Sequence, residues 1–381
     1  MSSHTQQNQI PLAQPDLGRR EEELVLEVLR SGRLSLGPMG ERFERAFADW
    51  LGTEDAVMVS SGTTALHLGV RALGWGSGDE VLTSPFSFVA SANCLLYEGA
   101  RPVFCEVEEE TLDLDPDAAA SAVGERTAGL LPVHIFGYPA AMPALEALAG
   151  RHGLAILEDA CEALGAVDSE GRAVGTRGNL ATFAFYANKQ MTTGEGGMIV
   201  PRDPAEAARL RSERNQGRAI DMGWLDHDRL GFNYRLSDLA AALGVAQVEK
   251  LDSLLERRAA VARLYEQGLA GIEGLRTPSP GGGVEKRSWF VYPVRLPERS
   301  DRDATIARLA ERGVASKAYL PCIHLFPHLR ELGYQEGQFP VAEAAAADSL
   351  ALPFFPAMSE AQVDRVCQEL AVALGQASRT A

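Results

Sequence analysis

The sequence predicts an α/β protein with a large, mixed but mostly parallel seven-stranded sheet and a smaller C-terminal α+β domain. Short apolar runs alternate with helical patterns through the first 200 residues, which is typical of a parallel sheet covered by helices. An uninterrupted helical pattern then covers residues 237–269 and is long enough to link two domains. The 381 residues, 46% of them hydrophobic, are sufficient for more than one domain core.

The elements of the large domain come first along the chain. Residues 1–10 are polar and predict a disordered tail, and residues 16–30 predict an amphipathic helix. We expect the large domain to cover residues 11–250. Its seven candidate strands are residues 56–59, 80–83, 102–107, 129–133, 154–157, 181–186 and 198–200.

The small domain is expected over residues 251–381. The pattern there predicts a loop at 277–283 and helices at 304–311 and 360–374. Strands are expected at 289–296 and 315–320.

Composition excludes several classes of function. The chain has 36 Lys and Arg against 52 Asp and Glu, a net charge of −16, which argues against nucleic acid as its main partner. No stretch is typical of a secretory signal or a membrane span. The five cysteines are scattered without a Cys-x-x-Cys pair, and the histidines form no metal-binding pattern. We therefore expect a cytoplasmic protein with reduced thiols and no metal site.

A candidate phosphate site follows the first strand. Small residues, Ser61-Gly-Thr-Thr64, separate the strand from a helical pattern, so backbone N–H groups and the positive helix end converge there. The hydroxyl of Thr63 can add a further donor. The same residues also fit a plain Ser or Thr helix cap, and alone the motif does not decide between them.

A candidate carboxylate pair ends the strand at 154–157. Glu158 and Asp159 follow the apolar run, and Glu162 comes three residues later. Ligands of α/β sheets bind beyond the carboxyl ends of the strands, where a carboxylate can hold a proton on a ring nitrogen. A helix cap with an acidic first turn is the alternative, and the motif by itself favours it.

A single lysine follows the aromatic strand at 181–186. Lys189 lies in a loop rich in Thr and Gly, a setting that can poise its amine as a nucleophile toward carbonyls. A surface lysine is the alternative. The phosphate site at residues 61–64, a carboxylate for a ring nitrogen and the lysine together predict a pyridoxal 5′-phosphate site. Phe88 could cover the ring of this cofactor or could belong to the core.

The chain resembles the DegT/DnrJ/EryC1/StrS family of pyridoxal-phosphate-dependent sugar aminotransferases from about Ile10 to the last helix. The resemblance implies the type I aminotransferase fold and a homodimer with shared active sites. The motifs that carry it are Ser61-Gly-Thr-Thr-Ala-Leu66, Gly78-Asp-Glu-Val81, Glu158-Asp-Ala160, Asn188-Lys189, Thr192-Thr-Gly-Glu-Gly-Gly-Met198, Gly231-Phe-Asn-Tyr-Arg235 and Leu352-Pro353.

The resemblance also implies roles for single residues. Lys189 matches the Schiff-base lysine, Asp159 the partner of the pyridinium nitrogen and Glu162 the residue that binds the ring hydroxyl. The remaining matches are Gly62 and Thr63 for the phosphate turn, Phe88 for ring stacking, Asn233 for the phosphate of the neighbouring subunit's cofactor, and Tyr319 and His324 for the sugar site.

One departure from the family concerns the phosphate. Many members have Ser five residues before the lysine, where this chain has Ala184. Losing that donor would cost about 1.5–3 kcal/mol, the range for a hydrogen bond to a charged group. Thr182, Tyr186 or water could compensate.

The expected activity is amino transfer from L-glutamate to a nucleotide-linked 4-keto-6-deoxy sugar. The 4-position rests on the likeness of residues 192–197 to 4-aminotransferases, and Lys189 stands where a dehydratase branch has His. Two alternatives stay open: another cyclic ketone, of the keto-inositol or aminoshikimate type, and a non-catalytic regulatory protein with the same fold.

Overall fold

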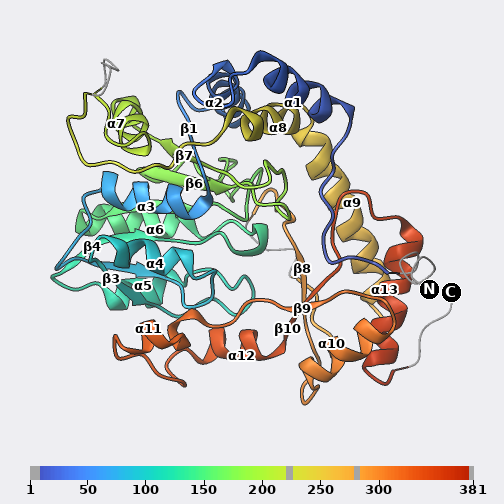
Figure 1. Ribbon diagram of the computed structural model, residues 1–381. Helices are drawn as coiled ribbons and strands as arrows, with labels where there is room; N and C mark the ends of the chain where they lie inside the picture. Colours follow the sequence, from blue (N-terminus) through green and yellow to red (C-terminus); the bar gives the residue numbers. More distant parts are fainter. Residues whose placement is uncertain (1–8, 220–225, 279–283, 377–381) are drawn as a thin grey trace.

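The large sheet matches the predicted architecture. The computed structural model describes residues 9–219, 226–278 and 284–376 (Figure 1). Within these residues a seven-stranded sheet has the order β1-β7-β6-β5-β4-β2-β3, and only β7 runs antiparallel to its neighbours. The strands are β1 Val57–Val59, β2 Glu80–Thr83, β3 Arg101–Phe104, β4 Thr127–Leu131, β5 Ala155–Asp159, β6 Leu180–Ala184 and β7 Gly197–Pro201.

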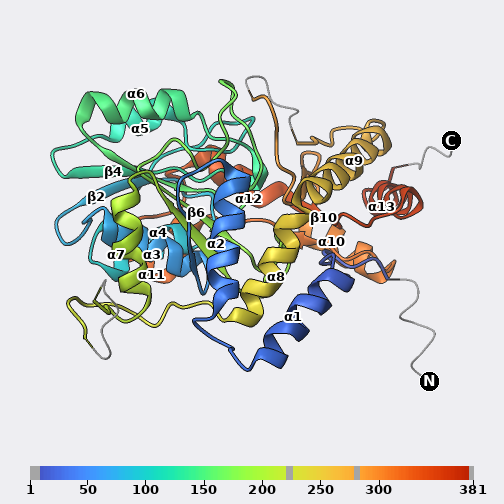
Figure 2. The same cartoon turned by 90° about the horizontal axis from the view of Figure 1, so that it is seen from above.

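Helices cover both faces of this sheet (Figures 1 and 2). One face carries α3 Gly62–Ala72, α4 Ala90–Tyr97 and α7 Pro204–Arg214. The other carries α5 Pro116–Ala122, α6 Met142–His152, α2 Pro38–Leu51 and α8 Asp238–Glu249, with α1 Arg19–Ser31 packed on α8.

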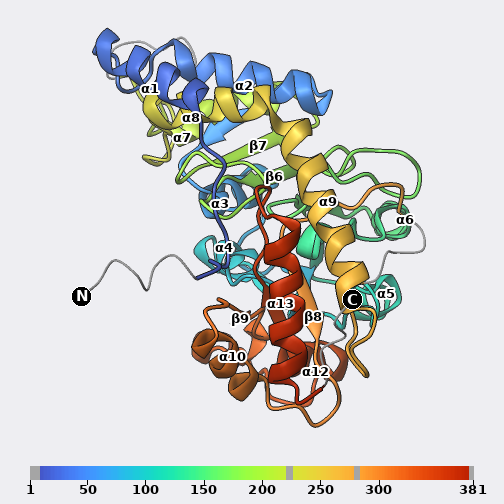
Figure 3. The ribbon, with the colours of Figure 1, turned by 90° about the vertical axis from the view of Figure 1, so that its right-hand side faces the viewer.

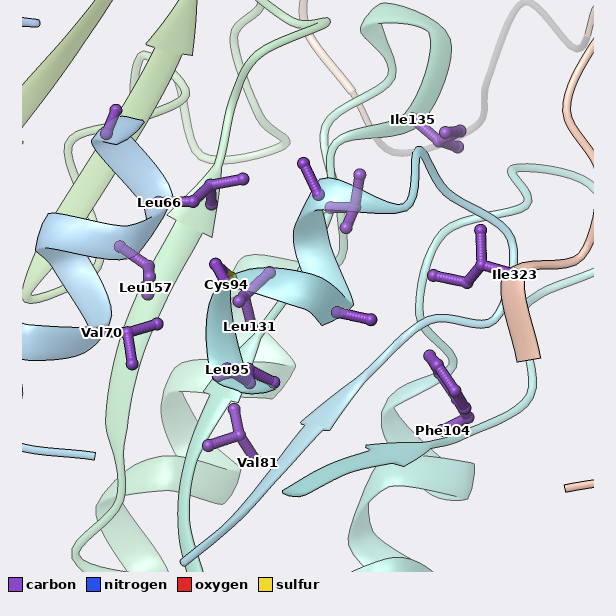
Figure 4. Packing of buried hydrophobic residues seen from close by; sticks show 14 of the residues in the cluster. Leu66, Val70, Val81, Cys94, Leu95, Phe104, Leu131, Ile135, Leu157 and Ile323 are labelled. Carbon is purple, nitrogen blue, oxygen red and sulfur yellow. The ribbon is translucent and has the colours of Figure 1, made fainter. Parts of the chain in front are cut away.

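Side-chain alternation along the strands divides the core between these two layers. Leu157 of β5 points to the α3 side and its neighbour Ile156 to the α6 side, as the period of two requires. Leu66 and Val70 of α3 lie over Leu157 (Figure 4). The helix lies so close that a Cβ on Gly69 would come within 2.7 Å of Leu157 Cδ1.

The small domain is built on α9 Leu251–Leu269, which packs beside α13 Glu360–Ala373 (Figure 3). The predicted single helix at 237–269 is in fact two, because Lys250 departs from helical geometry between α8 and α9. A three-stranded antiparallel sheet and α10 complete the domain. The sheet has the order β8-β10-β9, with β8 Tyr292–Arg295, β10 Ser349–Leu352 and β9 Lys317–Ala318, and α10 is Arg302–Glu311.

A segment assigned by the sequence to the small domain returns to the large one. It comprises η3 Ile323–Leu325, α11 Pro327–Arg330 and α12 Pro340–Asp348. Ile323, Leu329 and Phe339 belong to the same buried cluster as Phe104 of β3. This segment therefore covers the far edge of the large sheet and carries residue 320 and its neighbours toward the strand ends.

The chain is ordered earlier than the predicted boundary at residue 10. Ile10 is 3% exposed, lies in the small-domain core, and donates its N–H to the carbonyl of Gly313 at 2.8 Å. This corrects the end of the predicted tail, of which residues 1–8 lie outside the described residues. Across the described ranges, we find no helix with the length and apolarity that a bilayer crossing needs.

Candidate active site

Three functional segments meet at one edge of the large sheet. β1 and β6 both run antiparallel to β7, so their carboxyl ends lie at the same edge as that of β5. A cavity of about 500 Å³ opens there. It is lined by seven residues that the sequence predicted: Gly62, Thr63, Phe88, Asp159, Glu162, Lys189 and Tyr319.

The phosphate cradle is the first turn of α3. Ser61 Oγ accepts from the Thr64 N–H at 3.1 Å, and Thr64 Oγ1 accepts from the Ser61 N–H at 3.0 Å. The N–H groups of Gly62 and Thr63 have no acceptor within the helix, because first-turn donors never do. A Cβ on Gly62 would lie 2.7 Å from the Cβ of Ala184, so glycine leaves the backbone open at this point. The cap and the phosphate site are therefore compatible, and the turn fits a phosphate group.

Lys189 extends into the cavity from the loop after β6. Its Nζ lies 3.5 Å from Glu162 Oε1 and 4.0 Å from the centroid of the Phe290 ring. The Lys189 carbonyl accepts from the guanidinium of Arg258 at 3.0 Å, which fixes the backbone that carries the amine. Burial of Arg258 lowers its pKa to about 9. Lys189 is thus enclosed within the site, which excludes the surface-lysine alternative.

Glu162 lies between the lysine and the domain junction. Its Oε2 accepts from the Phe136 N–H at 3.0 Å. Burial raises the pKa of Glu162, and the nearby Lys189 ammonium only partly opposes this effect. The carboxyl group is therefore poised to exchange a proton with a polar group in the cavity.

Asp159 ends β5 with its carboxylate toward the cavity. Oδ1 accepts from the Cys161 N–H at 3.2 Å, and Oδ2 accepts from Ser91 Oγ at 2.7 Å. Its neighbour Glu158 points to the opposite face, because side chains alternate along a strand. Adjacent carboxylates thus enter different environments.

Glu158 belongs to the core of the large domain rather than to the cavity. Burial alone would raise its pKa, but hydrogen bonds from His134 and from backbone N–H groups outweigh burial and lower it. The backbone donors are those of Gly175, Arg177 and Gly178. This carboxylate ties the loop after β5 to the sheet.

Phe88 lies at the cavity with 60% of its surface exposed. Such exposure contradicts the alternative of core packing and leaves the ring free to contact a planar ligand.

Two predicted residues lie outside this cavity. Asn233 is exposed and pairs with Asn215 in an isolated bridge next to α7. His324 is fully buried, with Nε2 3.2 Å from Glu343 Oε1 and its ring 4.8 Å from that of Phe339. This corrects the expectation for His324: η3 turns its side chain into the core of the returning segment.

Ala184 also lines the cavity, and only one of the two side chains proposed to compensate for it does so. Thr182 is fully buried, donates to the Glu158 carbonyl at 3.2 Å, and does not reach the phosphate cradle. Tyr186 lines the cavity and is 51% exposed.

Sequence reasoning missed several residues of the site. Ser87 and Ser91 line the cavity, and hydrogen bonds connect Ser87 to Ser91 and Ser91 to Asp159. The only feature of the sequence that could have indicated this contact is the spacing of four residues between the two serines at the start of a helix. Asn188, directly before the lysine, holds a buried Oδ1 without a hydrogen-bond partner among the described residues. No periodicity marks Phe290, which reaches Lys189 from the other domain.

The fold and the cavity together define an aminotransferase of the type I fold. Residues 15–371 match the model of the DegT/DnrJ/EryC1/StrS aminotransferase family, and the chain belongs to this family. Its members depend on pyridoxal 5′-phosphate, and the α3 turn, Asp159 and Lys189 line one cavity in this chain.

Similar proteins share nearly the whole chain. The GDP-perosamine synthase of Caulobacter vibrioides is 38% identical over 95% of this chain and 97% of its own. The structure of DesV from S. venezuelae is 39% identical, covers 92% of this chain and 93% of its own, and superposes with a TM-score of 0.86. The structure of a 3-amino-5-hydroxybenzoic acid synthase is 30% identical in sequence and superposes with a TM-score of 0.90. The match covers 97% of this chain and 99% of the synthase.

Proposed function

We propose that this aminotransferase moves the amino group of L-glutamate to C4 of a nucleotide-linked 4-keto-6-deoxy sugar. The observation that carries the proposal is the joint placement of Lys189, Asp159 and the α3 turn in one cavity. The similarity to a GDP-perosamine synthase over nearly the full length of both chains supports a nucleotide-sugar substrate.

Residues of this chain would hold the cofactor in distinct ways. The N–H groups of Gly62 and Thr63 bind its phosphate, Phe88 contacts its ring and Glu162 binds the ring oxygen. Bound pyridoxal phosphate supplies an aldehyde carbon for covalent attachment and a conjugated ring that stores an electron pair.

Proton transfer is the task of two further side chains. The Nζ of Lys189 takes the proton from the α-carbon of glutamate and later returns a proton to the sugar carbon. Asp159 keeps a proton on the ring nitrogen through its negative charge. The Phe290 ring lies 4.0 Å from Nζ and covers one side of the amine.

The proposal includes a homodimer with shared sites. Asn233 is exposed and outside its own subunit's cavity, as a residue that serves the neighbouring cofactor phosphate would be. Large apolar side chains are exposed around it and on α1, including Leu26, Leu29, Leu230 and Tyr97. A monomer by light scattering, together with full activity, would contradict this part.

We also propose that the protein works in the cytoplasm. All five cysteines are free thiols, four of them buried, which suits a reducing compartment.

The test is the absorbance of the cofactor-loaded protein before and after addition of L-glutamate. Conversion to the pyridoxamine form, followed by recovery on adding a nucleotide-linked 4-keto-6-deoxy sugar, is the expected result. Conversion without recovery on that sugar would contradict the ketone assignment. No response to glutamate would contradict the donor.

A different cyclic ketone is the second candidate, favoured by the likeness to a 3-amino-5-hydroxybenzoic acid synthase at 30% identity. Recovery on a keto-inositol or an aminoshikimate-type ketone, with none on the nucleotide sugar, would select it. A purely regulatory role is disfavoured because Lys189, Asp159 and Glu162 all line the cavity.

A further inference from the structure

We propose that Ser87 and Ser91 are positioning residues whose hydroxyl groups form a directional hydrogen-bond chain ending on Asp159. The chain fixes the orientation of this carboxylate toward the ring nitrogen of the cofactor. The inference rests on the proposed function of Asp159, and it assigns to Ser87 and Ser91 the task of orienting the Asp159 carboxylate.

The direction of the chain follows from the chemistry of its members. Ser91 Oγ lies 2.7 Å from Asp159 Oδ2, and Ser87 Oγ lies 2.7 Å from Ser91 Oγ. An ionised carboxylate only accepts hydrogen bonds, so Ser91 must donate its single hydroxyl proton to Asp159. The proton between the two serines therefore belongs to Ser87. Each donation polarises the next one, which strengthens the contact at the carboxylate.

Burial makes this arrangement rigid. Ser87 and Ser91 are each 1% exposed and Asp159 is 5% exposed. Bulk water is therefore a poor substitute donor, and losing either hydroxyl leaves a buried acceptor with a lost partner. With Cys161 N–H on Oδ1 and Ser91 on Oδ2, both oxygens of Asp159 are tethered and its plane is set.

The same turn also carries the aromatic residue at the cavity. The Ser91 N–H donates to the Phe88 carbonyl at 3.2 Å, so the chain and the Phe88 ring share one backbone segment. The returning segment holds the base of this turn, where the Ile323 N–H donates to the Pro85 carbonyl at 2.9 Å. A shift of Ser91 would thus displace Phe88 and Asp159 together.

The test compares Ser91→Ala, Ser91→Thr, Ser87→Ala and the Ser87→Ala/Ser91→Ala double variant. The primary readout is the pH titration of the visible absorbance of each cofactor-loaded variant. We expect Ser91→Ala to shift the titration midpoint and to slow the glutamate half-reaction about tenfold, with little change in KM for glutamate. Thr keeps the hydroxyl and should restore most of both.

The double variant checks that the two serines form one chain. Ser87→Ala should have the smaller effect, and the double variant should match Ser91→Ala, because the distal hydroxyl acts only through the proximal one. Fully additive effects would overturn the chain. Asn93→Ala is the matched control from the same helix, since its amide contacts His328 instead.

A purely structural role predicts a different result. Thermal unfolding of the cofactor-free variants would then fall while the absorbance titration and the half-reaction of the folded fraction stay as in the wild type. That result, or a Ser91→Thr variant as impaired as Ser91→Ala, would overturn the proposal. The titration needs neither glutamate nor ketone, so a wild-type protein that titrates but ignores glutamate would contradict only the proposed function.

Discussion

The two walls of the cavity differ in how their residues are held. The sheet wall places Asp159, Lys189 and the α3 turn at or just beyond strand ends, within a continuous hydrogen-bonded sheet. The small-domain wall consists of Tyr319, which lines the cavity, and Phe290, whose ring contacts Lys189 Nζ; both lie in irregular segments beside short strands. We therefore expect the chemistry common to the family to lie on the sheet wall and the choice of ketone to depend on the small-domain wall, which is built from loops.

The largest expected effect belongs to the sheet wall. Lys189→Ala should slow the glutamate half-reaction at least about a thousandfold, because proton transfer by a positioned amine contributes about 10²–10⁴-fold and the covalent anchor is also lost. Stopped-flow absorbance measures this rate directly. Lys189→Arg, which keeps a cation but offers no basic amine, should be similarly slow. Turnover near the wild-type rate in either variant would refute the assignment of Lys189, and with it the sheet wall, to the chemical step.

A second prediction separates two carboxylates within that wall. Asp159→Asn should slow the half-reaction about a hundredfold or more while the protein stays folded, because it removes the charge that faces the cavity. Glu158→Gln should instead lower the free energy of unfolding by about 1.5–3 kcal/mol, the range for a hydrogen bond to a charged group, because an amide cannot accept from His134 and the backbone N–H groups as the carboxylate does. Chemical denaturation and single-turnover rates give the two numbers. Equal loss of rate in both variants would remove the distinction.

The sequence revealed most of the sheet wall for a physical reason. A strand that ends in Glu158-Asp159 and a lysine after the next strand must meet at one edge once the sheet is parallel, so no tertiary detail is needed. The alternation of side chains along β5 predicts that the two carboxylates face opposite sides of the sheet. It does not predict which of them faces the cavity, because the sequence does not show which face of the sheet carries α3. The structure decides this through the packing of Leu157 under that helix.

The small-domain wall was less predictable from the sequence, because its contacts depend on how the segment after Tyr319 packs back onto the large domain. The strand β10 was missed: four residues between α12 and Pro353 carry too little pattern to distinguish it from a helix end. His324 follows Tyr319 by five residues, yet a turn of η3 sends its ring into the core. The Ser87–Ser91 chain likewise requires α4 to cross above β5, which no local pattern states.

A third prediction tests the small-domain wall. Tyr319→Phe should raise KM for the keto sugar up to about tenfold, the effect of losing one hydrogen bond of about 1.4 kcal/mol. The glutamate half-reaction should change less than about twofold. Burial raises the pKa of Tyr319, so its hydroxyl stays protonated through neutral pH and is able to donate a hydrogen bond.

His324→Gln is the matched control for this wall. It should leave both half-reactions unchanged and lower the free energy of unfolding by about 1–2 kcal/mol, because a buried hydrogen bond to Glu343 is weakened. A raised KM for the ketone in this variant would show that the returning segment contributes to the substrate site after all.

The smallest effect concerns Glu162, at the junction of the two walls, and appears in stability rather than in rate. Because burial holds its pKa above the ordinary value of 4.5, folding favours the neutral carboxyl group. The cofactor-free protein therefore loses stability from this residue as the pH rises above that value, and Glu162→Gln, which stays neutral, escapes the loss. Thermal unfolding should show a stabilisation by Glu162→Gln that is larger at pH 8 than at pH 5. The exposed Glu298→Gln serves as the control. A pH-independent difference would mean that the Lys189 ammonium, 3.5 Å away, fully compensates the buried charge, and the junction would then hold a preformed ion pair.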